Sequence, residues 1–257
     1  MNRFWSWLFL LVPIGGVATF VAAPYFNIWL PRDISEHGHT IDSLFMFILY
    51  LTGTVFVITQ LVLSYFSWKF GRDSNDEQVK FSHGSHVLEI VWTILPAITL
   101  LFIAIVQMEA WASAKMQAPD MLPMVEVTGR QFNWDFRYAG PDGELYTKDD
   151  FVRTDGKLYL PVNQEVLLKI TSADVLHSFF LPNLRLKQDV VPGMDQYMWF
   201  KAKEKGGYDI VCAELCGWGH YKMKGRVFFL SAEDYKDKLE ELRLEQNTMR
   251  VAQESDE

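Results

Sequence analysis

Three long apolar stretches in the first half of the chain constrain its fold more than any other feature. They run from about residue 4 to 21, 44 to 66 and 88 to 106, and each is close to the ~20 residues of helix that cross a bilayer. Arg3, the first apolar run and the small residues after it also fit a signal peptide. That run exceeds the ~7 to 15 apolar residues of a signal peptide, so we expect a retained helix. The sequence predicts a membrane region over residues 1–116 with three helices, the last two forming a hairpin.

Basic residues orient these helices in the membrane. The loop between the second and third stretches carries Lys69, Arg72 and Lys80, whereas the loop before the second has Arg32 among acidic residues. Lys and Arg concentrate in cytoplasmic loops. We therefore expect the N-terminus inside, and everything after the third helix outside. The mean hydropathy of +0.02 is an average over an apolar membrane part and a polar part outside the membrane.

Beyond Gln117 the chain changes to short β-rich runs separated by turn residues such as Pro192-Gly193 and Gly206-Gly207. Many short strands without a helical pattern between them predict a β-sandwich or barrel. We expect this domain over residues 117–230, followed by a charged, helix-favouring tail over 231–257. The predicted strands are 125–130, 133–138, 158–160, 165–171, 175–180, 196–201, 208–211 and 225–230. The expected fold class is thus a membrane-anchored all-β protein.

Charge and cysteine content exclude several classes of function. The formal net charge is -8 and no basic stripe is present, which argues against a nucleic-acid partner. Two cysteines are too few for a disulfide scaffold, and a chain of this length does not need one. A Cys-x-x-Cys-His sequence is absent, so no c-type haem is expected on this chain.

The densest chemistry lies in the segment VCAELCGWGHYKMKG. Cys212, Cys216, His220 and Met223 follow one another with the spacing C-x3-C-x3-H-x2-M. Two thiolates, an imidazole and a thioether form a soft donor set, and the thioether favours copper over zinc or magnesium. A mononuclear blue copper site needs one Cys and two His, whereas two Cys in one short loop can bridge two metal ions. The segment therefore predicts a copper site.

A second histidine must come from elsewhere, and His177 in TSADVLHSFF is the best candidate. The four remaining histidines fall in loops between the apolar stretches, at positions 37, 39, 83 and 86. Two simpler interpretations of the cysteines stay open. A disulfide between Cys212 and Cys216 would leave His220 and Met223 unexplained, and structural zinc takes Cys and His rather than Met. His177 by itself is also compatible with a hydrogen-bonded core residue.

These residues resemble the binuclear CuA copper site of subunit II of cytochrome c oxidase, a haem-copper respiratory oxidase. The resemblance extends over roughly residues 44–230 through the segments IVWTILPAI, ADVLHS, LKQDVVPG and CAELCG. It implies a cupredoxin-like β-domain in which Cys212 and Cys216 bridge two copper ions. His177 and His220 would each bind one copper, with Met223 and the backbone carbonyl of Glu214 as weak ligands.

The resemblance also implies partners and a location. The chain would be the electron-accepting subunit of an enzyme complex, taking electrons from a c-type cytochrome or another haem c donor. It would pass them to the haem-containing subunit I, where oxygen is reduced to water with proton pumping. Subunits I and III and membrane lipids are the expected partners. A bacterial plasma membrane is expected, crossed several times, with the C-terminal domain on the outer face.

Five residues acquire further roles from the resemblance. The Glu214 side chain and Asp189 would lie at a magnesium or manganese site shared with subunit I, and Glu89 at the mouth of a proton path. In the aromatic stretch G-x-Q-W-x-W, Phe132 replaces the first Trp. Phe132 and Trp134 are therefore the expected points where electrons enter. Simpler interpretations are a helix-start carboxylate for Glu89, a turn residue for Asp189, and core packing for the two aromatic residues.

Two other functions compete with this interpretation. A membrane-anchored copper chaperone with a thioredoxin-like fold also uses C-x3-C and a distant His, but requires β-α-β alternation, which the C-terminal region lacks. Subunit II of a quinol oxidase has a similar structure without copper. The retention of every ligand position argues against it.

Overall fold

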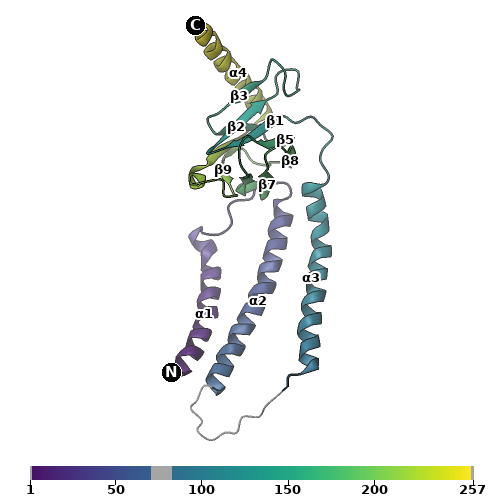
Figure 1. Ribbon diagram of the computed structural model, residues 1–257, viewed down its shortest axis with the longest axis vertical. Helices are drawn as coiled ribbons and strands as arrows, with labels where there is room; N and C mark the ends of the chain where they lie inside the picture. Colours follow the sequence, from purple (N-terminus) through teal and green to yellow (C-terminus); the bar gives the residue numbers. More distant parts are fainter. Residues whose placement is uncertain (1, 71–82, 256–257) are drawn as a thin grey trace. The chain divides into compact units, whose positions relative to one another are not determined.

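The computed structural model describes residues 2–70 and 83–255 (Figure 1). The helices are α1 (Asn2–Ala22), the short 3-10 helix η1 (Ala23–Phe26), α2 (Gly38–Phe70), α3 (His86–Lys115) and α4 (Ala232–Ser255), with two further 3-10 turns, η2 (Pro182–Leu184) and η3 (His220–Lys222). The chain divides into two compact units. One comprises Met1–Leu30 and Asp42–Met108, and the other comprises Pro31–Ile41 and Glu109–Glu257.

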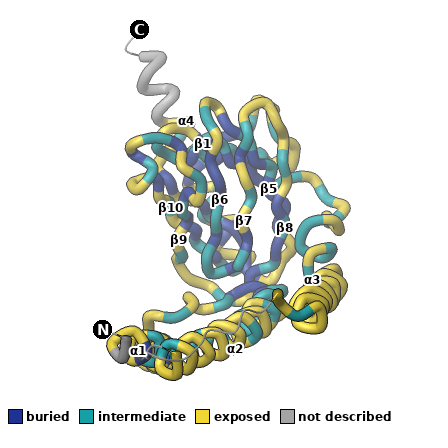
Figure 2. Tube along the Cα trace, turned by 60° about the horizontal axis from the view of Figure 1, so that its bottom comes forward, coloured by how far each residue is buried: buried dark blue, intermediate teal, exposed yellow. Residues whose placement is uncertain are grey.

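Three of the described helices are long and apolar enough to cross a membrane. These candidate spans are Phe4–Phe26, Gly38–Phe70 and His86–Lys115, each longer than the apolar run from which it was predicted. Little of their apolar surface is covered by the chain itself, and α1, α2 and α3 are mainly exposed in Figure 2. Lipid or other subunits must cover such a surface. The loop predicted to be cytoplasmic, with Arg72 and Lys80, lies outside the described residues.

Side-chain contacts link the three helices of the first unit. Ser64 on α2 donates a hydrogen bond to the carbonyl of Ser6 on α1, at 2.8 Å. The rings of Phe20 and Tyr50 meet edge to face, and Phe47 on α2 meets Phe102 on α3 in the same way. Each neighbouring pair of helices is thus in contact at a few points.

The second unit contains a β-sandwich of two five-stranded sheets. Its strands are β1 (Val125–Arg130), β2 (Asn133–Tyr138), β3 (Phe151–Arg153), β4 (Lys157–Pro161), β5 (Glu165–Ser172), β6 (His177–Leu181), β7 (Leu186–Val190), β8 (Gln196–Lys201), β9 (Gly206–Cys212) and β10 (Lys224–Leu230). One sheet has the order β3-β2-β1-β5-β8, and the other β4-β10-β9-β6-β7. The predicted sandwich is confirmed, whereas "all-β" describes only this part of a chain that also has long helices.

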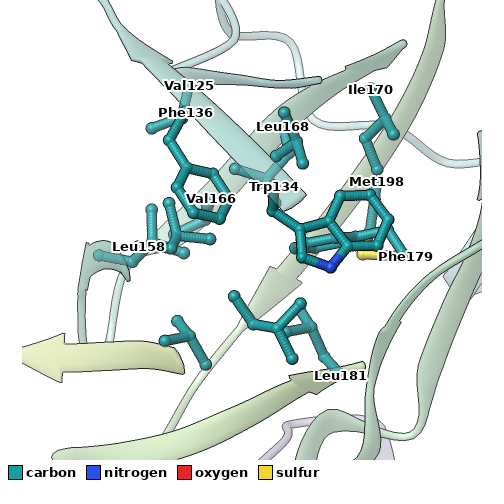
Figure 3. Close-up of a cluster of buried hydrophobic side chains, with 14 of the residues drawn as sticks. Val125, Trp134, Phe136, Leu158, Val166, Leu168, Ile170, Phe179, Leu181 and Met198 are labelled. Atoms are coloured by element: carbon teal, nitrogen blue, oxygen red, sulfur yellow. The ribbon is translucent and has the colours of Figure 1, made fainter. Parts of the chain in front are cut away.

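The core fills the space between the two sheets. Successive side chains of a strand point to opposite faces, and on β2 the alternating residues Trp134, Phe136 and Tyr138 are all fully buried. Trp134 and Phe136 lie with Phe179 and Leu181 of the opposite sheet in the cluster drawn in Figure 3. Burying one such side chain contributes roughly 1.5–3 kcal/mol. This dry core fixes the strand ends that carry the candidate site.

The segment between α1 and α2 belongs to the sandwich unit, which the sequence did not predict. Ile34 is 1% exposed and part of the sandwich core. Its N–H donates to the carbonyl of Asn183, and its carbonyl accepts from the N–H of Lys203. Ser35 forms an isolated β-bridge with Ala202. The connection from α1 to α2 therefore lies on the same side of any membrane as the sandwich, as the predicted topology requires.

The charged, helix-favouring C-terminal stretch forms the helix α4. Tyr235 and Leu242 lie seven residues apart on one face of α4, and both are buried. The N–H of Val152 on β3 donates to the side chain of Gln246, and Arg153 pairs with Glu245. The stretch is rich in charged residues because only one face of α4 packs on the sandwich.

Candidate metal centre

Two strand pairings bring the predicted copper ligands together. β9 and β10 are antiparallel neighbours, and the N–H of Cys212 donates to the carbonyl of Met223 at 3.1 Å. The loop between these residues therefore begins and ends at one place. β6 lies on the other side of β9, with Phe179 opposite Cys212. His177, the first residue of β6, consequently reaches the same strand end.

The ligand atoms form a compact group. The Cys212 and Cys216 sulfurs are 3.9 Å apart, and the Nδ1 atom of His177 is 3.9 Å from the Cys212 sulfur. The Cys216 sulfur is 3.6 Å from Nδ1 of His220 and 3.7 Å from the sulfur of Met223. A disulfide needs about 2.05 Å between its sulfurs, so both cysteines are free.

These distances fit shared metal ions. Metal–thiolate bonds are about 2.3 Å long, which limits two sulfurs on one ion to a separation of about 4.6 Å. The two cysteine sulfurs satisfy this limit, and His177, Cys212 and Cys216 form a group whose ligand atoms all lie within 4.8 Å of one another. Soft sulfur and imidazole donors of this kind suit copper. The donor set therefore fits a copper centre, and the nearby Met223 thioether strengthens the fit.

The site is dry, which affects the thiols. Cys216 and Met223 are 3% and 1% exposed. Burial, followed by the negative charge of a neighbouring Cys212 thiolate, raises the pKa of Cys216 to about 11. The Cys216 thiol thus keeps its proton at neutral pH until a cation replaces it.

Asp174 holds the buried histidine. Nε2 of His177 lies 2.8 Å from a carboxylate oxygen of Asp174, which leaves Nδ1 directed toward Cys212. The backbone N–H groups of Gln131 and Val175 donate to the same carboxylate. Partial burial alone would raise the pKa of Asp174, but these hydrogen bonds outweigh it and hold the pKa below its usual value. An ionised Asp174 therefore orients His177, as carboxylates commonly do for metal-bound histidines.

The turn between β1 and β2 closes over the ligand loop. Gln131 donates from its side-chain amide to the carbonyl of Cys216 at 2.5 Å. A Cβ atom on Gly219 would lie 2.5 Å from the Phe132 ring, and one on Gly217 would lie 3.1 Å from it. Glycine at both positions thus lets the ring rest against the loop backbone. The sequence stretch around Phe132 signalled this contact, whereas the role of Gln131 was not predicted.

Trp134 lies behind the centre, in the core. It is fully buried, its ring centroid is 6.0 Å from that of His177, and its Nε1 atom has no hydrogen-bond partner among the described residues. Gly129 makes room for the imidazole, since a Cβ there would be 3.0 Å from the His177 ring. Phe132, by contrast, is only half-buried. Trp134 therefore offers no surface to a soluble partner, and its role in electron entry stays a prediction.

Asp189 and Ala213, the residue before Glu214, both form a hydrogen bond with Ser178 beside the centre. The carbonyl of Glu214 is 3.2 Å from the Cys212 sulfur. The backbone carbonyl of Ser178 accepts a hydrogen bond from the N–H of Ala213. The Ser178 hydroxyl donates a hydrogen bond to the carboxylate of Asp189 at 2.8 Å. The two predicted carboxylates thus come from the loop after β9 and from the exposed position 189 of β7, the strands on either side of β6.

Glu89 lies in the membrane-helix unit and in the first turn of α3. Its carboxylate is 3.2 Å from Nδ1 of His86, with both side chains largely exposed. This contact also fits a helix-start carboxylate. A role in proton uptake remains a prediction from the resemblance.

Comparison with known proteins places both parts of the chain in one family. The family described as "Cytochrome C oxidase subunit II, periplasmic domain" matches residues 124–227. The family described as "Cytochrome C oxidase subunit II, transmembrane domain" matches residues 24–110. The two matches are consecutive and leave unmatched mainly the first helix, a short connection and α4.

Individual proteins resemble the chain over most of its length. "Alternative cytochrome c oxidase subunit 2" of Bradyrhizobium diazoefficiens is 30% identical, covering 91% of this chain and 90% of that protein. "Cytochrome c oxidase subunit 2" of Cereibacter sphaeroides is 31% identical, with coverages of 82% and 77%. The crystal structure of the periplasmic domain of subunit II of cytochrome oxidase (CoxB) of Bradyrhizobium japonicum has 26% identity and a TM-score of 0.44, covering 50% of this chain and 99% of that chain.

Proposed function

The chain belongs to the cytochrome c oxidase subunit II family and is thus a subunit of an oxidoreductase complex. From this premise we propose that it carries a binuclear CuA centre. The centre accepts electrons from a c-type cytochrome or another haem c donor outside the membrane. Subunit I receives these electrons and reduces oxygen to water, with proton pumping. The cupredoxin-like sandwich is the framework that holds the centre.

The single observation that supports this proposal is the meeting of five soft or imidazole donors at one strand end. His177, Cys212 and Cys216 lie within coordination reach of one another, and His220 and Met223 approach Cys216. A zinc site would leave the buried Met223 thioether without a role. A disulfide has less support, because the sulfurs are 3.9 Å apart and a disulfide would leave His220 and Met223 without a role.

Each ligand has a distinct part in this proposal. Cys212 and Cys216 would each hold both ions, His177 and His220 would each hold one, and Met223 and the Glu214 carbonyl would be weak ligands. When bound, the copper pair supplies one-electron transfer. Asp174 fixes the ring of His177, and the dry loop excludes water from the sulfurs. A rigid site of this kind suits a relay, because its ligands keep their positions when an electron arrives.

The remaining assignments follow from family membership. We propose that Glu214 and Asp189 contribute to a magnesium or manganese site shared with subunit I, and that Glu89 serves proton uptake. Subunit III is a further partner. The membrane is a bacterial plasma membrane, with the sandwich on its outer face. The basic Lys69 at the far end of α2 supports that orientation.

The two competing functions have less support. A thioredoxin-like copper chaperone requires helices between its strands, whereas β1–β10 follow one another with only short 3-10 turns between them in the described chain. A quinol-oxidising relative has no need of the sulfur and imidazole donors grouped here.

Electron paramagnetic resonance of the full chain, purified in detergent and loaded with copper, tests the proposal. One electron shared over two copper ions gives a multi-line spectrum that a single copper does not. We expect this spectrum in the wild-type chain and its loss in Cys216→Ser, with circular dichroism confirming that the variant is folded. A wild-type chain that binds no copper, or a spectrum of isolated copper ions only, would contradict the CuA assignment.

A further inference from the structure

The loop that carries the ligands also carries three unusually exposed apolar side chains. Leu215, Trp218 and Tyr221 are 75%, 80% and 65% exposed. These are the highest values among the large hydrophobic side chains of the described residues from 117 onward. Apolar surface gathered at one place on a domain that otherwise buries it marks an interaction site. The patch lies on the ligand loop itself, so a partner bound there approaches the copper ligands.

Trp218 connects this patch to the ligands. It lies between Cys216 and His220 in the chain, and its ring meets the edge of Phe132 with 6.0 Å between the centroids. Phe132 in turn rests on the backbone of Gly217 and Gly219. A continuous path of aromatic rings and loop backbone thus leads from the ligands to solvent. Because Trp134 is buried and Phe132 is half-buried, Trp218 is the member of this aromatic group that is largely open to solvent.

A cation and the strand direction define the setting of Trp218. The ammonium group of Lys222 lies 5.5 Å from the Trp218 ring centre, which favours one orientation of the indole. β9 runs from Gly206 to Cys212. Its first residue follows shortly after Lys203, whose N–H donates a hydrogen bond to the carbonyl of Ile34. Seven residues of strand span roughly 20 Å. The patch therefore lies at the end of the sandwich remote from segment 31–41, which leads to the membrane helices.

We propose that Trp218 is the side chain that a soluble electron donor contacts, in the place of a tryptophan at position 132. The donor is a small haem protein whose haem edge reaches its surface among apolar residues. The exposed face of the Trp218 indole offers such an edge an apolar contact. This inference rests on the proposed copper function. One electron leaves the ferrous haem iron, which becomes ferric, and the copper pair is reduced by that electron; Trp218 undergoes no net change.

The test compares the full copper-loaded chain with Trp218→Ala, Trp218→Phe and Tyr197→Ala. Tyr197 is an exposed aromatic residue on β8, outside the ligand loop, and serves as the matched control. Stopped-flow absorption follows reduction by a soluble mitochondrial-type cytochrome c, and by hexaammineruthenium(II), which is too small to need a docking patch. A second measurement is the dissociation constant of oxidised cytochrome c for the metal-free chain, by isothermal titration calorimetry.

We expect Trp218→Ala to lower the second-order rate constant with cytochrome c about tenfold and to weaken its binding by a similar factor, as for a central aromatic contact. Trp218→Phe should recover part of both, and reduction by the ruthenium complex should not change. Tyr197→Ala should behave as the wild type.

Equal rates and equal binding for wild type and Trp218→Ala would overturn the inference. So would a loss confined to assembly with subunit I, since the patch would then face that subunit. If Trp218→Ala fails to hold copper, its binding constant in the metal-free chain still decides the matter. A wild-type chain that holds no copper pair would contradict the proposed function itself, which is a different result.

Discussion

The thioether of Met223 differs from the two thiols in what it can contribute. It is buried 3.7 Å from the Cys216 sulfur and carries no charge to balance a metal ion. A weak ligand of this kind tunes a copper site rather than building it. Met223→Leu conserves volume, so the fold should lose less than about 1.5 kcal/mol.

We therefore expect Met223→Leu to keep both copper ions while shifting the reduction potential, as measured by protein-film voltammetry. Met198→Leu is the matched control, because Met198 is buried in the same core on β8 and lies away from the ligand loop. An unchanged potential in Met223→Leu, or loss of copper, would contradict a weak-ligand role.

Asp174 permits a second test at this scale. Asp174→Asn retains an oxygen that can accept from His177 Nε2 but removes the negative charge behind the ligand. Because that charge favours the more oxidised centre, the variant should have a raised reduction potential with its copper content unchanged. Redox titration followed by absorption measures the shift. The exchange Asp195→Asn, at an exposed carboxylate paired with Lys169, should leave the potential unaltered.

The Cys216 proton makes copper uptake depend on pH. Burial raises the pKa of this thiol to about 11, so at neutral pH the metal-free chain holds a proton that copper must displace. The apparent copper affinity should therefore rise with pH, by up to about tenfold per unit for each proton released. Competition titrations against a chelator between about pH 6 and about pH 8 measure this. An affinity independent of pH, after correction for the chelator, would contradict the protonated thiol.

At the level of elements, segment 31–41 has the clearest energetic consequence. Ile34 is a core residue contributed from between two membrane helices. Ile34→Ala removes buried methyl groups and should lower the free energy of unfolding by about 2–4 kcal/mol. Denaturant unfolding of the sandwich, followed by tryptophan fluorescence, measures the change. Thr40→Ala, at an exposed position in the first turn of α2, is the control and should have little effect.

Some elements could be predicted from the sequence and others could not. Strands β1 and β2 were predicted with their observed bounds, because apolar residues alternate along them. Strand β7 was missed since only Leu186 and Val190 of its five residues are buried, at its two ends. Strand β3 has three residues, too few to show a period. Segment 31–41 has no periodic pattern, and its place follows from tertiary contacts alone.

For the whole molecule, the ligand set was predictable and its surroundings were not. Cys212, Cys216, His220 and Met223 lie close together in sequence, and a single loop must keep them near one another. The contact of Gln131 with the Cys216 carbonyl joins residues 85 positions apart. The exposure of Trp218 likewise depends on the packed sandwich. The spacing of residues along the chain cannot predict contacts of this kind.

The topology of the whole chain leads to a prediction about its two ends. The three proposed spans would place the N-terminus and the sandwich on opposite sides of the membrane, and the basic Lys69 at the end of α2 favours the inner side for that end of α2. A periplasm-dependent alkaline phosphatase fused after Glu257 should be active, and the same enzyme fused before Met1 inactive. Activity at both ends would show that the first helix does not span the membrane as proposed.

The burial of Ile34 also imposes an order of events during synthesis. Its hydrogen-bond partner Lys203 leaves the ribosome 169 residues later, a delay of roughly 10 to 30 s at usual rates of translation. In the proposed topology, the connection between α1 and α2 crosses the bilayer once α2 has been made, well before the strands that bury Ile34 have been synthesised. A chaperone at the outer face could therefore bind segment 31–41 before the loop from Cys212 to Met223 has been synthesised and can receive copper.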